Sequence, residues 1–520
     1  MLTSRPRDRY DVVVVGSGAA GLTAAVAAAD AGLSVLVLEK AARLGGTSAV
    51  GGGVIWAPGN HVMAAAGFPD SAESARAYLG TGRMSAGNIA AYVADAPAAV
   101  RFLTGAGVRM RALARPDYHP EWPGAARGRG LDQEPFDPRP WPGLAELLRP
   151  PTYFPLITMA ERDALAGAPA DPDLLARRAS EGIRTMGGAL VGRLLVAALD
   201  RGVEVAASTP VTGLEPGWIV QAGREIHAPA VVLASGGFEW NPALRDAFLP
   251  YPVTPISAPG NTGEGLVLGL RAGAAVAEMT AVWGVPVLTP PTARYDGQPS
   301  GRMGNVEMTL PGSITVDPGG RRFVNEAVNY HDLNRAFGAI GSRAFLVFDR
   351  AYLDRYPVAG FTTPQDWMLQ ADSLDALAEA IGPALVSTVE EFNAGARRGE
   401  DPLFGRGASP QDRHLGDPAI TPNPCLAPLE RAPFFAVPIH AGVLGTAGGL
   451  ATNGDGRVID HDGAPIPGLY AAGNCAATLF RDSYPGGGAT LGSAIVRAYR
   501  VGRHLGALAR RADGRVASGG

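Results

Sequence analysis

The chain has 520 residues, 46% of them hydrophobic and 18% charged, and a formal net charge of -4. This length exceeds what one hydrophobic core usually supports, so two domains are expected. The slightly acidic balance excludes nucleic-acid binding through a basic surface, and two cysteines exclude a disulfide framework and a cysteine-rich metal cluster, so we expect neither nucleic acid nor metal.

The first predicted unit is a strand, a glycine turn and a helix. Val12–Val15 is followed by Gly16-Ser-Gly-Ala-Ala-Gly21 and an Ala-rich run to Asp30, and a second apolar run, Val35–Leu38, ends at Glu39. Glycines at this spacing allow a tight turn from strand to helix, whose N-terminus binds a pyrophosphate. Glu39 stands where an acid accepts a hydrogen bond from the adenosine ribose. The unit therefore predicts dinucleotide binding and not a secretory signal.

The segments that follow favour FAD over NAD. Arg43-Leu-Gly-Gly-Thr-Ser48 comes directly after the acid, and residues 51–53 add a second glycine cluster. Amides and hydroxyls of such loops reach a buried phosphate. A further strand and turn, Gly468-Leu-Tyr-Ala-Ala-Gly-Asn474, is what a flavin enclosed at both ends requires. The residues predicted to bind FAD are Gly16, Gly18, Ala19, Ala20, Gly21, Glu39, Lys40, Gly45, Gly46, Thr47, Ser48, Gly52, Gly53, Val211, Ala234, Gly236, Gly473, Asn474 and Leu491.

The next part of the chain predicts helices over residues 71–105 and 180–200, separated by a proline-rich loop region over 114–175. Long structured loops tend to carry function. Strand-like runs follow at residues 203–205, 218–220 and 230–233, and the last run leads into the glycine turn at 234–237.

The pattern changes at about residue 281 and returns to strands and glycines from Gly442. Short strands (314–316 and 344–348) and helices (373–381 and 385–394) lie between these points. We therefore predict an α/β fold with a Rossmann-like FAD-binding domain formed by both chain ends. The predicted boundaries are 1–280 and 443–520 for that domain and 281–442 for an inserted α+β catalytic (substrate) domain.

No window reaches the ~18 apolar residues that a membrane-spanning helix needs. We expect a cytoplasmic protein without a transmembrane segment. Lys40 is the only lysine, so catalysis through a lysine Schiff base is nearly excluded.

Four segments together resemble a known family. The chain is similar to the flavoprotein group that contains fumarate reductases and 3-ketosteroid dehydrogenases. The similarity lies in the glycine turn of residues 16–21, in Gly45-Gly-Thr-Ser48, in Arg322-Phe-Val-Asn-Glu326 and in the C-terminal segments 468–474 and 484–488. The similarity covers nearly the whole chain. Within the group the chain most resembles the 3-ketosteroid Δ1-dehydrogenases, through tyrosines in three separate segments: Tyr118, Tyr330 and Tyr484-Pro-Gly-Gly-Gly488.

The resemblance implies an FAD-dependent oxidoreductase of steroid degradation that introduces a carbon 1–carbon 2 double bond into an apolar 3-ketosteroid. The Tyr484 hydroxyl and the Gly488 amide hold the ketone oxygen, which is an oxyanion-hole task. Tyr330 takes the proton beside the carbonyl with help from Tyr118, and flavin N5 accepts the hydride. A quinone or similar external acceptor then reoxidises the flavin. Peripheral contact with a membrane, to collect such a substrate, is left open.

Two residues depart from the family pattern. Gly487 stands where the family usually has proline, so the ketone clamp is expected to be looser. His119 replaces the family's second tyrosine and introduces an imidazole. Both departures bear on substrate range and pH optimum.

Three alternatives remain open from the sequence. A reductase of small unsaturated acids would use basic side chains such as His331 and Arg335. A ketosteroid dehydrogenase acting at another ring position would differ mainly in the C-terminal loop. A flavin-binding protein without turnover is disfavoured by the intact Tyr330 and Tyr484.

Overall fold

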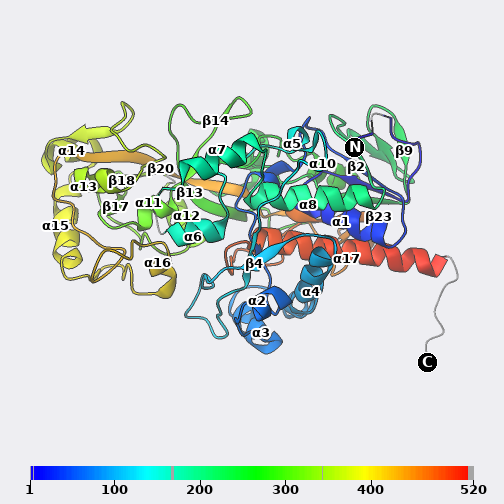
Figure 1. Ribbon diagram of the computed structural model, residues 1–520, viewed down its shortest axis with the longest axis horizontal. Helices are drawn as coiled ribbons and strands as arrows, with labels where there is room; N and C mark the ends of the chain where they lie inside the picture. Colours follow the sequence, from blue (N-terminus) through cyan, green and yellow to red (C-terminus); the bar gives the residue numbers. More distant parts are fainter. Residues whose placement is uncertain (1, 4, 166–168, 342, 513–520) are drawn as a thin grey trace.

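The computed structural model describes residues 2–3, 5–165, 169–341 and 343–512. The molecule is elongated, and elements from both chain ends lie together at one end of the long axis (Figure 1). The helices and strands of residues 305–414 form the opposite end. The mixed α/β fold is therefore confirmed, and two large sheets carry it.

The first sheet has six strands in the order β22-β23-β10-β1-β2-β6. All but the edge strand β22 run parallel, and the four valines of β1 are buried. Parallel strands are covered on both faces, which explains their continuous apolar runs. The strands are β1 (Val12–Val15), β2 (Val35–Leu38), β6 (Glu204–Ala206), β10 (Ala230–Leu233), β22 (Arg457–Ile459) and β23 (Pro465–Ala471).

One face of this sheet is covered by α1 (Ala19–Asp30), which packs between α8 (Met186–Asp200) and the C-terminal helix α17 (Ala489–Ala512). A Cβ at Gly502 of α17 would lie 2.4 Å from the Cβ of Ala27, so the two helices approach closely. Small residues on α1 allow this contact, and it fixes the C-terminal segment against the first helix of the chain.

The second sheet has seven strands, with β16-β13-β20-β18-β17 in order and β11 and β19 also paired with β20. Its central strand β20 runs over Phe434–Thr446, so the predicted boundary at residues 442 and 443 falls inside one strand. The division into domains stays a prediction. The other strands are β11 (Thr254–Pro255), β13 (Val282–Leu288), β16 (Arg302–Met303), β17 (Ser313–Val316), β18 (Arg343–Asp349) and β19 (Leu369–Ala371).

Several predicted elements have different bounds in the structure. The helix predicted over 71–105 is two helices, α3 (Ala72–Thr81) and α4 (Ala86–Gly105), because Ser85 caps a new helix at its N-terminus. The helix predicted from residue 180 begins at Met186, after a turn in which Gly182 has a φ of +69°. The region predicted as loop contains β5 (Gly130–Gln133), α5 (Leu144–Leu147), α6 (Met159–Leu165) and α7 (Pro172–Ser180).

The remaining elements are shorter. None of the helices in the described ranges is both long and apolar enough to cross a membrane. Near the first sheet lie β3 (Ile55–Trp56), β4 (Met110–Ala112), β7 (Gly213–Glu215), β8 (Ile219–Gln221), β9 (Glu225–His227), β12 (Val276–Ala277), β21 (Gly449–Leu450), α2 (His61–Ala65), α9 (Pro242–Phe248) and α10 (Glu264–Arg271). The hairpin of β14 (Arg294–Tyr295) and β15 (Gln298–Pro299) connects β13 to β16 of the second sheet. The second sheet is flanked by α11 (Asn305–Thr309), α12 (Tyr330–Ala339), α13 (Arg350–Arg355), α14 (Leu374–Ile381), α15 (Leu385–Ala396) and α16 (Pro410–His414).

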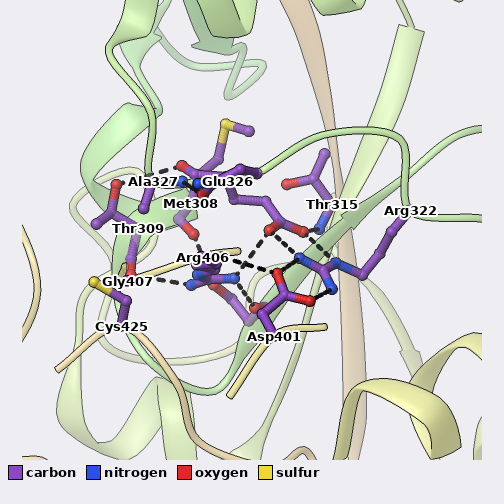
Figure 2. A network of polar contacts seen from close by, with 12 residues as sticks. Met308, Thr309, Thr315, Arg322, Glu326, Ala327, Asp401, Arg406, Gly407 and Cys425 are labelled. Atoms are coloured by element: carbon purple, nitrogen blue, oxygen red, sulfur yellow. Dashed lines mark hydrogen bonds and ion pairs between the residues drawn. The ribbon is translucent and has the colours of Figure 1, made fainter. Parts of the chain in front are cut away.

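A buried ion network fixes the segment that leads into α12 (Figure 2). Arg322 donates to both carboxylate oxygens of Glu326, at 2.9 and 2.7 Å, and to Asp401 at 2.9 and 2.8 Å. The guanidinium of Arg406 lies 3.4 Å from Glu326, whose carboxylate also accepts from the amide of Thr315. Burial opposes the charged form of Glu326, but the two guanidinium groups outweigh it and hold the pKa of Glu326 below its usual value.

Replacing Glu326 with Gln leaves two buried guanidinium groups without their shared anion. We expect Glu326→Gln to lower the free energy of unfolding by about 3–5 kcal/mol at neutral pH, measured by urea denaturation. Because the folded-state pKa of Glu326 is lowered, its contribution is lost as the pH falls below about 4, and the difference from the parent should shrink there. Glu390→Gln on the exposed face of α15 is the control. Equal stability of all three proteins would contradict this role.

Candidate active site

One cavity of about 1530 Å³ runs from the N-terminus of α1 to the inner side of the second sheet. Its lining includes residues from the loops at the carboxyl ends of β1, β2 and β10, where ligands bind in open α/β sheets. It also includes Tyr118, Tyr330, Tyr484 and Gly488. The predicted cofactor region and the predicted catalytic residues thus share one space.

The turn after β1 approaches its neighbours so closely that only glycine fits. Gly16 has a φ of +108°, and a Cβ there would lie 2.4 Å from the carbonyl oxygen of Ala234. The carboxylate of Glu39 accepts hydrogen bonds from the amide of Ser17 at 3.1 Å and from its hydroxyl at 2.6 Å. Its other oxygen accepts from the amide of Ala41 at 2.9 Å. Glu39 therefore orders the glycine loop as well as lining the cavity.

The loop of Gly45 to Ser48 is tied to the same turn. The amide of Gly45 donates to the Ser17 hydroxyl at 2.9 Å, and the Ser48 hydroxyl accepts from the amide of Ala19 at 3.0 Å. Thr47 accepts from the side chain of Asn261 at 2.8 Å. These hydroxyls hold the loops together, which is a role that the sequence did not predict.

The residues present fit a dinucleotide. Within the described part of the chain, no group accepts a hydrogen bond from the amide of Ala20, in the first turn of α1, and Ala20 lines the cavity. Free amides at a helix N-terminus bind phosphate. At Gly46 a Cβ would meet no atom within 4 Å, and at Gly18 the nearest atom is the Ser48 hydroxyl oxygen at 3.4 Å, so such a group has room to approach the backbone there. In FAD the pyrophosphate would lie at this turn.

Almost all residues predicted to bind the cofactor line the cavity. Gly21 and Gly45 do not, and their contact with the cofactor stays a prediction. A Cβ at Gly21 would lie 2.0 Å from the carbonyl oxygen of Gly16, and one at Gly45 would lie 2.7 Å from the Cβ of Ala49. Both glycines serve the close packing of the turn.

Three tyrosines from distant segments meet at the centre of the cavity wall. The hydroxyl of Tyr330, at the start of α12, donates to the hydroxyl of Tyr484 at 3.0 Å. The ring centroid of Tyr118 lies 5.2 Å from that of Tyr330 and 5.5 Å from that of Tyr484. The hydroxyl of Thr490 shares a hydrogen bond of 3.0 Å with the hydroxyl of Tyr484 and so helps to orient it.

The loop after Tyr484 brings backbone to the same point. Gly488 has a φ of +97°, and a Cβ there would lie 2.5 Å from the carbonyl oxygen of Val54, so no other residue fits. Among the described residues none accepts a hydrogen bond from its amide. A Cβ at Gly487 would lie 3.2 Å from the hydroxyl of Tyr118, so glycine at this departure from the family pattern leaves space beside Tyr118.

Burial keeps the phenols protonated in the free protein. It raises the pKa of Tyr330 well above the usual value, and the neighbouring phenols of Tyr118 and Tyr484 raise it further. Burial also raises the pKa of Tyr484 and that of Tyr118, while the positive charge of Arg115 opposes part of the rise at Tyr118. A phenol of this kind is a good hydrogen-bond donor and needs help to become a base.

Several polar residues near the tyrosines point elsewhere. The imidazole of His119 stacks on Trp122 with centroids 3.9 Å apart and does not line the cavity. His331 contacts the backbone oxygen of Asp482 at 3.0 Å, and Arg335 is half-exposed. Arg481 pairs with Glu278 at 2.9 Å. None of the four lines the cavity.

The wall opposite the nucleotide end contains residues that the sequence did not indicate. It is formed by α6, α7, α11, α16 and the segment around residue 115. Arg115 pairs with Asp163 at 2.8 Å, while Arg162, Glu307 and His414 also line this wall. Isolated charged residues carry no motif, and only the length of the proline-rich region hinted at a function here.

Comparison with known proteins identifies a family and several relatives that the chain resembles. The model of the family described as FAD binding domain matches residues 11–491. The 4-oxocyclohexanecarboxylate 2-dehydrogenase of Sinomonas cyclohexanicum is 41% identical, with 99% of this chain and 96% of that protein covered. The 3-oxosteroid 1-dehydrogenase of Mycobacterium tuberculosis is 35% identical, covering 95% of this chain and 98% of that protein.

Among solved structures, the 3-ketosteroid delta1-dehydrogenase of Sterolibacterium denitrificans, in complex with 1,4-androstadiene-3,17-dione, has a TM-score of 0.89. It is 31% identical, and the match covers 96% of this chain and 100% of that one. The fold and length of the chain are thus those of this structure.

Removing the Glu39 carboxylate should loosen the glycine loop, because three donors lose their acceptor. We expect Glu39→Ala to raise the FAD dissociation constant by on the order of tenfold or more while the protein still folds. The readouts are the flavin-to-protein absorbance ratio after purification and titration of the apoprotein with FAD. Glu73→Ala on the exposed side of α3 is the control, and unchanged FAD affinity in Glu39→Ala would contradict the assignment.

Proposed function

The chain belongs to the FAD-binding flavoprotein family whose model spans residues 11–491, and on this premise we propose that it dehydrogenates the carbon–carbon bond beside a ring ketone. Family membership confirms the predictions of FAD as cofactor and of an FAD-dependent oxidoreductase. The observation that carries the proposal is the meeting of Tyr118, Tyr330, Tyr484 and Gly488 in the cavity that also holds the predicted FAD residues.

The ketone oxygen would lie between the Tyr484 hydroxyl and the amide of Gly488. Thr490 can donate its hydroxyl hydrogen to the Tyr484 oxygen, which leaves the single hydroxyl hydrogen of Tyr484 free for the substrate. Two donors aimed at one oxygen stabilise the negative charge that develops as the ketone enolises. They also make the hydrogens on the neighbouring carbon more acidic.

Tyr330 is the proposed base. Its hydroxyl lies 3.0 Å from that of Tyr484, so a ketone held by Tyr484 presents its neighbouring carbon to Tyr330. Tyr330 takes a proton from that carbon, and the electron pair left behind forms the carbon–carbon double bond as the next carbon loses a hydride. When bound, FAD supplies the two-electron acceptor for that hydride. Tyr118, whose ring lies edge-on to Tyr330, assists the removal of the proton.

Two substrate classes share this chemistry. The relatives are named for a 3-oxosteroid and for 4-oxocyclohexanecarboxylate, and both compounds contain a six-membered ring ketone. The sequence predicted a 3-ketosteroid as substrate, with a new carbon 1–carbon 2 double bond in the product. This substrate stays a proposal, and a single-ring keto acid is the second candidate. An external acceptor such as a quinone would reoxidise the flavin in either case.

A reductase of unsaturated acids is less well supported. Its candidate residues, His331 and Arg335, do not line the cavity, and burial lowers the pKa of His331 and so disfavours its charged form. The phenols at the cavity wall suit an enolising ketone better than a dicarboxylate. Anaerobic flavin bleaching by ring ketones, compared with reoxidation of reduced flavin by fumarate, separates these two functions.

Tyr330→Phe removes the proposed base without changing the ring. We expect kcat for ring-ketone dehydrogenation to fall by on the order of 100-fold or more, with FAD content and ketone binding retained. Tyr499→Phe on α17, a tyrosine outside the cavity lining, is the matched control and should keep its activity. A Tyr330→Phe protein with near-parental kcat would show that another group is the base.

The pH profile reports the state of the same phenol. Tyr330 acts as phenolate, and its pKa is raised above about 10, so the phenolate fraction grows tenfold with each pH unit across the neutral range. We expect the logarithm of kcat/KM to rise with unit slope from about pH 6 to about pH 9 without a plateau. A plateau that begins near neutral pH would instead indicate a base with a lower pKa.

A further inference from the structure

The wall of the cavity between α6 and α16 contains a cationic group without a counter-ion. Arg162 lines the cavity, and within the described ranges no carboxylate lies within ion-pair distance of its guanidinium. Its neighbour Asp163 accepts hydrogen bonds from the Nε and Nη2 atoms of Arg115. Burial and then the positive charge of Arg115 lower the pKa of Arg162, which is the effect of a desolvated cation beside another cation.

The carboxyl group of Glu307 also lines this wall and offsets only part of the positive charge of Arg162 and Arg302. It forms no ion pair with the described residues, and burial raises its pKa, which disfavours its anionic form. Arg302 donates to the backbone oxygen of Ala359 and lies 4.8 Å from the ring centroid of Tyr153. The wall therefore has an excess of positive charge.

Two residues of α16 that line the cavity carry unpartnered polar atoms. The Nε2 atom of His414 and the Oε1 atom of Gln411 are buried and have no hydrogen-bond partner among the described residues. Both residues line the cavity, and they lie three positions apart on one side of the helix. Burial, with the charge of Arg115, lowers the pKa of His414 to about 4, so its imidazole is neutral and offers one N–H donor. Buried polar groups without partners mark the place of a polar ligand.

From this arrangement we propose that Arg162 and His414 bind a carboxylate of the substrate, and that the enzyme acts on ring ketones carrying an acid group. This rests on the proposed function, because the ketone end is the one assigned to Tyr484. Both ends line one cavity. The Arg115–Asp163 pair links them, because Tyr118 is three residues from Arg115 and Arg162 precedes Asp163.

An apolar steroid would leave these groups without partners. A guanidinium and an imidazole N–H covered by hydrocarbon lose water and gain no hydrogen bond, which is costly in a buried site. A carboxylate offers acceptors for a guanidinium fork and for the imidazole N–H together. The wall thus discriminates between substrates by charge, while the tyrosines recognise the ketone that both substrate classes share.

The test compares two molecules of the same shape. 4-Oxocyclohexane-1-carboxylate and its neutral carboxamide are assayed with the FAD-loaded enzyme, and binding of 4-hydroxybenzoate and 4-hydroxybenzamide is measured by the change in flavin absorbance. We expect the parent to prefer the acid by on the order of 10- to 100-fold in kcat/KM and in affinity. Arg162→Met should abolish this preference, because the acid then gains no more than the amide from the wall.

Two further variants test whether the acid preference depends on the positive charge of residue 162. Arg162→Lys retains the charge and should keep part of the preference, and Arg177→Met on the exposed side of α7 should keep all of it. Turnover of ring ketones with an acid preference that survives Arg162→Met would overturn the inference and leave the proposed function standing. If no ring ketone reduces the flavin, but the preference for 4-hydroxybenzoate still depends on Arg162, the proposed function falls and the carboxylate site stands.

Discussion

The contact between the hydroxyls of Tyr330 and Tyr484 is the interaction on which the proposed chemistry depends. It joins residues 154 positions apart, one at the start of a helix beside the second sheet and one in the loop before α17. Each phenol is held separately. Asn329 caps the helix that begins with Tyr330, and Thr490 holds the hydroxyl of Tyr484. Tyr484 is buried and Tyr330 is half-buried, and both line the cavity, so their hydrogen bond lies where a substrate can meet it. The tyrosine group therefore exists only when both sheets and both chain ends are assembled.

The nucleotide end was accessible to sequence reasoning because its constraints are local. Gly16, Gly18 and Glu39 stand within one strand–turn–strand unit, and their spacing follows from the geometry of that unit. The glycines at 21 and 45 show the limit of such reasoning. Their spacing matches the pattern, yet they serve packing, because only coordinates reveal what a Cβ would meet. The tyrosines came from a family resemblance, since no local pattern distinguishes Tyr118 from any aromatic residue in a proline-rich loop.

The wall around Arg162 could not be predicted for a different reason. Whether a buried arginine is structural or recognises a ligand depends on its counter-ions, and these come from distant segments. Arg322 and Arg406 both pair with Glu326, so their positive charge is balanced by a carboxylate within the fold. Arg162 has no such partner among the described residues. The same residue type thus stabilises the protein at one place and is available for recognition at the other.

The long strand β20 limits how the molecule can move. Its first part pairs with β18 and its last part with β13, and at its end the amide of Thr446 reaches Glu239 at 3.2 Å, beside the cofactor loops. This strand of 13 residues has one irregularity, opposite Trp283 and Gly284, and its pairing with β13 and β18 keeps it within the second sheet. Any movement of one sheet against the other therefore has to bend the chain outside β20. Such a movement also has to preserve or break the contact of Thr446 with Glu239, which ties the end of the strand to the segment after β10.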